Sequence, residues 1–149
     1  VPLFGQLYWL SGNILIDRKN KSKALNTMLA AAERIRRNNL SVWMFPEGTR
    51  SYGRGLLPFK MGAFHIAMEA GVPLVPVCMS SSHGQFKLNR WNNGKVIVQL
   101  LAPVSIPDKE QMNIRQFAEK LHQQMQAQIA ELDSELGNDY TASIKTAKE

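Results

Sequence analysis

Apolar residues recur at helical spacing in three parts of the chain. The first part covers residues 22–37, the second residues 61–70, and the third begins after Asp108, which with Gln111 resembles a helix capping box. Gly71 is a typical stop for the second helix. The third helix is the longest and carries one apolar stripe: Ile114, Phe117, Leu121, Met125, Ile129 and Leu132. We therefore expect a long amphipathic helix near the C-terminus.

Short apolar runs bounded by turn residues predict strands between these helices. They cover residues 13–17, 42–45, 72–77 and 95–101. Residues 72–77 contain Pro73 and Pro76, which cannot donate ladder hydrogen bonds, so this strand is expected to be irregular or at a sheet edge. Alternation of strands and helices predicts an α/β layered domain. In such domains, ligands bind in loops beyond the carboxyl ends of strands.

Length and charge narrow the possible functions. The chain has 149 residues, the size of one domain, and a net charge of +6. Residues 1–60 hold ten Lys or Arg against three acids, and residues 61–149 hold eight against nine. This N-terminal excess favours an anionic ligand or an anionic surface, such as a lipid headgroup layer or nucleic acid.

Other classes of site find little support. Cys78 is the only cysteine, so no disulfide can form within the chain, and we interpret it as a small core residue. No phosphate-binding P-loop or dinucleotide fingerprint is found, and a structural zinc site or other metal site is not expected. No run of 18 apolar residues predicts a membrane span. Because the chain begins at Val1 inside structured sequence, we interpret it as a piece of a longer protein.

The segment FPEGTRS, residues 45–51, is the strongest candidate for binding chemistry. Gly48 allows a sharp turn or close approach of the backbone to a ligand, and Arg50 presents a planar fork suited to phosphate or carboxylate. Thr49 adds a hydroxyl, and Glu47 can accept hydrogen bonds. An alternative interpretation is a turn in which Glu47 and Arg50 only pair with each other.

Two further cations strengthen the binding interpretation. Arg18 follows the first predicted strand, and Lys60 lies at the start of the second predicted helix, where an anion is favoured. A solvated surface lysine is the alternative for Lys60. Of the three histidines, we expect His65 at a core or boundary position and His122 at the surface, and we assign none as a general base.

Three segments, in order, resemble motif blocks of the 1-acyl-glycerol-3-phosphate acyltransferases, the PlsC-like family. They are GNILIDR at residues 12–18, FPEGTRS at 45–51 and VPLVPV at 72–77. The resemblance implies a mixed β-sheet flanked by helices, in an acyltransferase domain over residues 1–136 that lacks its N-terminal part. Residues 137–149 are polar, and we expect them to form a disordered tail. It also implies transfer of a fatty acyl group from acyl-CoA or acyl carrier protein to the free sn-2 hydroxyl of lysophosphatidic acid, without a cofactor, to form phosphatidic acid.

The resemblance also implies roles for individual residues. Arg18, Arg50 and Lys60 would bind the phosphate, Glu47, Gly48 and Thr49 would position the glycerol, and Pro73 and Pro76 would shape the strand beside the acyl path. The family's His-x-x-x-x-Asp block, which supplies the base, is absent, since Ala70, Leu88 and Ala127 lie five residues after the three histidines. We therefore expect no catalytic residue in this chain and no activity from the chain alone.

The family also implies a setting, and two alternatives remain open. The expected location is the cytoplasmic face of a bacterial inner membrane, with an anionic membrane surface as partner and no nucleic acid. A related acyltransferase could use glycerol-3-phosphate or another lysophospholipid. A non-catalytic basic module that binds membrane or nucleic acid would explain the charge but not the ordered motif blocks.

Overall fold

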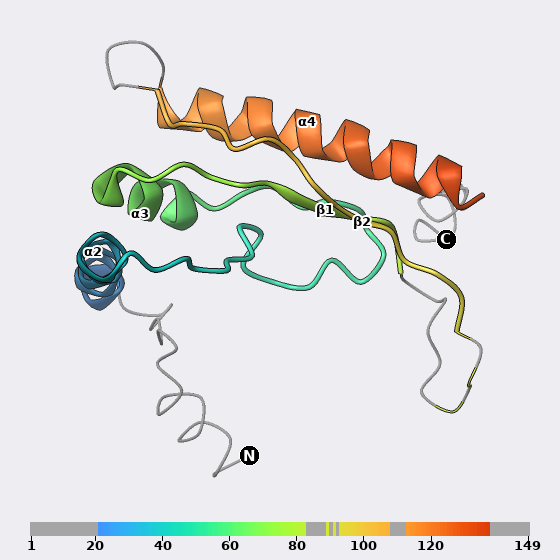
Figure 1. Ribbon diagram of the computed structural model, residues 1–149, viewed down its shortest axis with the longest axis horizontal. Coiled ribbons are helices and arrows are strands. Elements are labelled where there is room, and N and C mark those ends of the chain that lie inside the picture. The colour runs from blue at the N-terminus through green and yellow to red at the C-terminus, as the bar shows by residue number, and fades with distance from the viewer. Residues whose placement is uncertain (1–20, 83–88, 90, 92, 108–112, 138–149) are drawn as a thin grey trace. The chain divides into compact units, whose positions relative to one another are not determined.

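The computed structural model describes residues 21–82, 89, 91, 93–107 and 113–137. The chain divides into two compact units. The first comprises Val1–Met44 with Gly62–Val72, and the second comprises Phe45–Met61 with Pro73–Glu149. The elements of each are drawn in Figure 1.

The first unit contains helices α2, Lys21–Asn38, and α3, Gly62–Ala70, which pack against each other. Small residues let the helices approach closely, and Gly62 has no Cβ at a point where one would lie 3.4 Å from the sulfur of Met28. The shared core is apolar and is made by Ala31, Ala32, Ile35, Ile66 and Ala70. The first two predicted helices are thus confirmed.

Both helices of this unit end in the same way. After α3, Gly71 takes a φ of +66°, its N–H donates to the Met68 carbonyl, and the Val72 N–H donates to the Ala67 carbonyl. This pair of bonds is the Schellman motif, and it confirms Gly71 as the helix stop. After α2, Asn39 has a φ of +50°, a conformation that asparagine tolerates better than most residues.

The second unit contains a two-stranded antiparallel sheet covered by a long helix (Figure 1). Strand β1, Val77–Met79, pairs with β2, Val98–Leu100, with Cys78 opposite Gln99. An isolated bridge between Leu74 and Val104 continues the pairing beyond the strands. Helix α4, Ile114–Glu135, packs against β1.

The apolar stripe of α4 faces inward as predicted. Cys78 on β1 is completely buried, and its thiol lies 3.9 Å from the Met125 carbonyl oxygen. Four stripe residues are buried, and Ile114 and Ile129 are half-buried. The buried residues are Phe117, Leu121, Met125 and Leu132. Their side chains bury apolar surface, which is the main favourable contribution to this contact.

The start of α4 differs from the prediction. Asn113 is the N-cap, with extended φ and ψ, and its side-chain oxygen accepts a hydrogen bond of 2.9 Å from the Arg115 N–H. Asp108 and Gln111 lie outside the described residues. A helix that begins at Ile114 cannot use a cap six residues earlier, so the predicted capping box is wrong.

The strands are shorter than the apolar runs that predicted them. Residues 13–17 lie outside the described residues. Residues 42–45 form no strand, and Val42, Trp43 and Phe45 are exposed, so this prediction is wrong. An apolar run reports a tendency to be buried, whereas a strand also needs a paired neighbour. In the apolar run of residues 72–77, regular strand pairing begins only at Val77, after Pro76, because proline lacks the N–H that a ladder requires.

Candidate functional site

The FPEGTRS segment opens a long irregular loop, residues 45–60, which we call the 45–60 loop. Its first turn passes through Pro46 and Glu47 and is closed by a 3.0 Å hydrogen bond from the Gly48 N–H to the Phe45 carbonyl. Gly48 has a φ of +67°, which a residue with a side chain adopts only with strain. The glycine predicted to allow a sharp turn therefore does so.

Two hydrogen bonds tie the beginning of the 45–60 loop to its end. One oxygen of the Glu47 carboxylate accepts a 2.8 Å bond from the Leu57 N–H. The Lys60 N–H donates a 2.8 Å bond to the Pro46 carbonyl. A carboxylate is a strong acceptor for a backbone N–H, so Glu47 fixes the shape of the loop.

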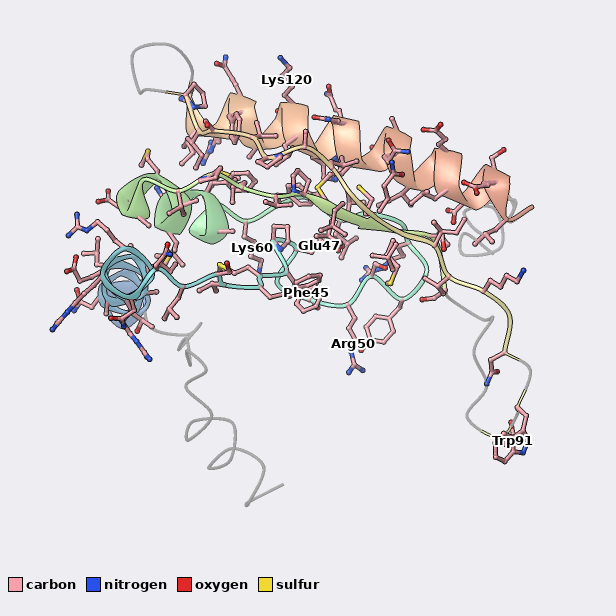
Figure 2. All side chains as sticks on the ribbon, viewed as in Figure 1. Phe45, Glu47, Arg50, Lys60, Trp91 and Lys120 are labelled. Atoms are coloured by element: carbon pink, nitrogen blue, oxygen red, sulfur yellow. The ribbon has the colours of Figure 1, made fainter. Side chains whose placement is uncertain are left out.

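Lys60 lies directly against Gly48. A Cβ placed on Gly48 would lie 3.1 Å from Cδ, 3.3 Å from Cε and 3.4 Å from Nζ of Lys60. The lysine side chain therefore occupies the space that a side chain at position 48 would fill. This contact brings together two residues that the sequence predicted for one site. Figure 2 shows Glu47 and Lys60 close together in this loop.

Thr49 and Arg50 are exposed. The Arg50 side chain points away from Glu47 and Lys60 (Figure 2). Among the described residues, which include both members of the proposed pair, no ion pair joins Glu47 to Arg50. The alternative of a turn held by that pair is therefore wrong, because Glu47 is engaged by the Leu57 N–H instead.

The remaining predicted site residues are not gathered at this loop by the described structure. Arg18 lies outside the described residues. Pro73 is exposed, and Pro76 is buried with its carbonyl accepting a 2.9 Å bond from the Leu101 N–H. The proline roles beside an acyl path, like the phosphate and glycerol roles, stay predictions.

His122 differs from its prediction as a surface residue. It is half-buried on α4, and its ring packs edge-to-face on Phe59 with centroids 4.8 Å apart and planes at 74°. Its Nε2 lies 3.3 Å from the Leu56 carbonyl oxygen. His65, expected at a core or boundary position, is exposed. His83 lies outside the described residues.

A buried carboxylate that the sequence analysis did not single out lies at the other end of α4. Asp133 is 1% exposed and accepts a 2.6 Å bond from the Ser81 N–H and a 2.7 Å bond from the Ser81 hydroxyl. The neighbouring Ser80 hydroxyl accepts a 3.0 Å bond from the Ile97 N–H. The sequence did contain a signal for Asp133, because an acidic residue on the apolar face of a predicted helix is expected to be buried with a partner.

The thiol and the acidic groups give no sign of nucleophilic or metal chemistry in the described part of the chain. Burial raises the pKa of the Cys78 thiol, which keeps it protonated and unreactive. Within the described ranges, no group of three His, Cys, Asp or Glu side chains could hold a metal ion. No helix in those ranges is both long and apolar enough to cross a membrane. The absence of a cofactor or metal stays a prediction.

Comparison with known proteins identifies relatives of this chain. It is 54% identical over 136 residues to a Haemophilus influenzae protein named 1-acyl-sn-glycerol-3-phosphate acyltransferase, covering 91% of this chain and 57% of that protein. A protein of the same name from Escherichia coli is 50% identical over 136 residues, covering 91% of this chain and 56% of that protein. The chain thus spans little more than half the length of these relatives.

A solved structure supports the fold. The crystal structure of the 1-acyl-sn-glycerophosphate (LPA) acyltransferase PlsC from Thermotoga maritima matches with a TM-score of 0.57 and 28% identity, covering 74% of this chain and 46% of that one. This likeness confirms the predicted fold class, an α/β sheet flanked by helices with a long C-terminal helix. Residues 1–80 match the family described as Acyltransferase. The chain therefore belongs to the acyltransferase family.

Proposed function

We propose that this chain is the substrate-binding part of an enzyme that moves a fatty acyl group onto the sn-2 hydroxyl of 1-acyl-glycerol-3-phosphate. The donor is a thioester, acyl-CoA or acyl carrier protein, and the product is phosphatidic acid. The observation that carries the proposal is the closed 45–60 loop, in which Glu47, Gly48 and Lys60 meet. The similarity of the chain, at 50–54% identity, to proteins named 1-acyl-sn-glycerol-3-phosphate acyltransferase supports it.

The chemistry requires a hydroxyl, a thioester and a base. The hydroxyl oxygen attacks the thioester carbonyl carbon, the base takes the hydroxyl proton, and the carbon–sulfur bond breaks to release the thiol. We assign no base to this chain, since none of its histidines has an aspartate five residues later. The chain's own contribution is to bind and orient the phosphorylated acceptor.

Lys60 and Arg50 would bind the acceptor phosphate. The Lys60 ammonium lies 3.4 Å from the Cβ position of Gly48, so an anion that approaches the Gly48 backbone also meets a cation. Arg50 is exposed and free to turn its guanidinium toward the same phosphate, where two parallel hydrogen bonds are possible. Arg18 would be the third cation that binds the phosphate. Thr49 and the backbone turn at Gly48 would orient the glycerol.

An Arg50→Ala substitution in the full-length protein tests the phosphate assignment. We expect the transition-state free energy that corresponds to kcat/KM with lysophosphatidic acid to rise by about 2–4 kcal/mol, because a charge-assisted contact to the phosphate is lost. Arg50→Lys should recover little, since lysine lacks the bidentate fork. Thiol release from acyl-CoA measures both variants.

Arg34→Ala is the matched control, since Arg34 is an exposed arginine on α2. It changes the net charge equally and should leave kcat/KM within twofold or so. Unchanged kinetics in Arg50→Ala would rule out the phosphate role. A general charge effect would instead lower activity equally in both variants.

We also propose that the enzyme works at the cytoplasmic face of a bacterial inner membrane. The excess of basic residues in the first 60 positions suits an anionic lipid surface as well as a phosphorylated substrate. A panel of acceptors tests which substrate is used. If the protein is a related acyltransferase, thiol will be released from the acyl donor faster with glycerol-3-phosphate or another lysophospholipid than with lysophosphatidic acid. Salt-sensitive, length-dependent nucleic-acid binding without thiol release would support a basic binding module instead.

A further inference from the structure

The shape of the 45–60 loop depends on one peptide unit, the one that joins Leu56 to Leu57. Its carbonyl oxygen lies 3.3 Å from Nε2 of His122, and its N–H donates to the Glu47 carboxylate over 2.8 Å. The described chain contains no cis peptide bond, and in a trans peptide the C=O and N–H point in opposite directions. His122 and Glu47 therefore lie at opposite edges of the same peptide unit.

The first hydrogen bond requires that one particular nitrogen of the imidazole carries a proton. A carbonyl oxygen can only accept, so Nε2 of His122 must carry the proton. Donation to the carbonyl polarises the peptide and makes its N–H a better donor to Glu47. The three groups thus form a chain of hydrogen bonds from helix α4 to the first turn of the loop.

A second contact holds His122 at this position. The imidazole packs edge-to-face on Phe59, which lies one residue before Lys60. An edge-to-face arrangement of two rings is favourable beyond the burial of their surface. His122 therefore contacts the loop at Leu56 and at Phe59, on the segment that leads directly to the lysine over Gly48.

We propose that His122 is a positioning residue of the acceptor site, which holds Glu47 and Lys60 in place through the Leu56–Leu57 peptide and the Phe59 ring. The inference rests on the proposed function, because it makes α4 part of the site that binds the phosphorylated acceptor. His122 has no contact with substrate in this role. It acts by keeping the loop in the conformation that binds.

Two substitutions separate the hydrogen bond from the ring contact. His122→Phe keeps a ring against Phe59 but removes the donor, whereas His122→Gln keeps an amide N–H near the position of Nε2 but removes the ring. Lys120→Ala is the matched control on the same helix, since Lys120 is exposed and points away from the loop (Figure 2). All are made in the full-length protein.

The first measurement is hydrogen exchange of individual backbone amides. In His122→Phe we expect exchange at Leu57 to rise roughly three- to tenfold, the size expected for loss of one neutral hydrogen bond. The Leu101 amide, bonded to the Pro76 carbonyl in the same unit, should keep its rate. This internal reference separates a local effect from general unfolding, even if the variant is less stable.

The second measurement is the kinetics of thiol release. His122→Phe should raise KM for lysophosphatidic acid roughly three- to tenfold and leave kcat almost unchanged, because the loop binds the acceptor but does no chemistry. His122→Gln should recover part of the loss. Lys120→Ala should match the unsubstituted protein in both measurements.

Each outcome decides one question. Equal Leu57 exchange and equal KM in His122→Phe and Lys120→Ala would overturn the positioning role. Equal losses in His122→Phe and His122→Gln would overturn the hydrogen-bond link. If the unsubstituted protein releases no thiol with lysophosphatidic acid, the proposed function fails, while faster Leu57 exchange in His122→Phe still supports the link between α4 and the loop.

Discussion

The 45–60 loop and the contact between α4 and β1 belong to the same unit but are held together in opposite ways. In the loop, the two hydrogen bonds that join its beginning to its end use backbone groups: the Leu57 N–H, the Lys60 N–H and the Pro46 carbonyl. Between α4 and β1, buried residues make the contact, among them Met125 on the helix and Cys78 on the strand.

This difference shows how the chain can keep a binding site adaptable. A loop fixed through its backbone leaves exposed side chains such as Thr49 and Arg50 available for a ligand. A helix fixed through its side chains has little such freedom, because each buried group fills space or completes a hydrogen bond. Substitutions should therefore mainly affect stability in the helix contact and substrate binding in the loop.

The largest expected effect is on the helix side, at Asp133. Asp133→Ala removes the acceptor of both Ser81 bonds and leaves the Ser81 N–H without its partner. Loss of hydrogen bonds to a buried charged group should lower the free energy of unfolding by about 2–4 kcal/mol. Urea denaturation of the full-length protein measures the change.

Glu119→Ala is the control for Asp133, because Glu119 is an exposed carboxylate on the same helix. Its free energy of unfolding should change by less than about 0.5 kcal/mol. If the two variants are equally stable, the buried network around Asp133 does not hold α4 in place.

A smaller effect is expected on the loop side, at Gly48. Gly48→Ala combines a positive φ with a Cβ that would lie 3.1 Å from Cδ of Lys60. The backbone strain alone should lower the free energy of unfolding by about 1–2 kcal/mol. Displacement of Lys60 should in addition raise KM for lysophosphatidic acid.

Gly71→Ala sharpens this test, since Gly71 has almost the same φ, +66°, and no atom within 4 Å of its Cβ position. It should lose similar stability without a change in KM. A raised KM in both variants would mean that strain alone, and not the contact with Lys60, alters binding. The two are compared by denaturation and by thiol-release kinetics.

The smallest effect concerns pH and the buried thiol on β1. Burial raises the pKa of Cys78 in the folded state, so above the ordinary thiol pKa of roughly 8.5 the unfolded chain releases this proton first. Deprotonation then favours unfolding, and stability should fall as pH rises above that value. Ionisation of one thiol lowers the free energy of unfolding by at most about 1.4 kcal/mol per pH unit.

Cys78→Ala removes the thiol that titrates, so the variant is compared with the unsubstituted protein at each pH. The difference in the free energy of unfolding between the two proteins should be constant below about pH 8 and should shrink above it. A difference that stays constant to pH 10 or so would show that the thiol ionises equally in both states. Thermal or urea denaturation across this pH range provides the measurement.

The amphipathic helices were predictable because their apolar spacing reports burial directly. Four of the six stripe residues of α4 are buried, and α3 ends at the predicted Gly71. Strands were predicted less well, since a run such as residues 42–45 does not specify a partner. The N-cap was misplaced because Asp108 and Asn113 are both good capping residues, and sequence spacing alone favoured the first.

The residues of the candidate site were predictable, but the contacts that shape the site were not. Glu47, Gly48 and Lys60 were all identified from the sequence and meet in the structure. The partner of Glu47 is a backbone N–H, which no residue type marks, and so the alternative pairing with Arg50 could not be rejected. His122 was misjudged for a similar reason, since its partners lie more than 60 positions away.

The Leu56–Leu57 peptide has a consequence for how the sequence can vary. Both of its polar groups are engaged, yet neither bond uses a side chain of these two residues. The hydrogen-bonded link between Glu47 and His122 therefore sets no requirement of its own on the half-buried side chains of Leu56 and Leu57. Proline at position 57 is the exception, because it has no N–H to donate. Natural variants of this loop should accordingly exclude proline at position 57.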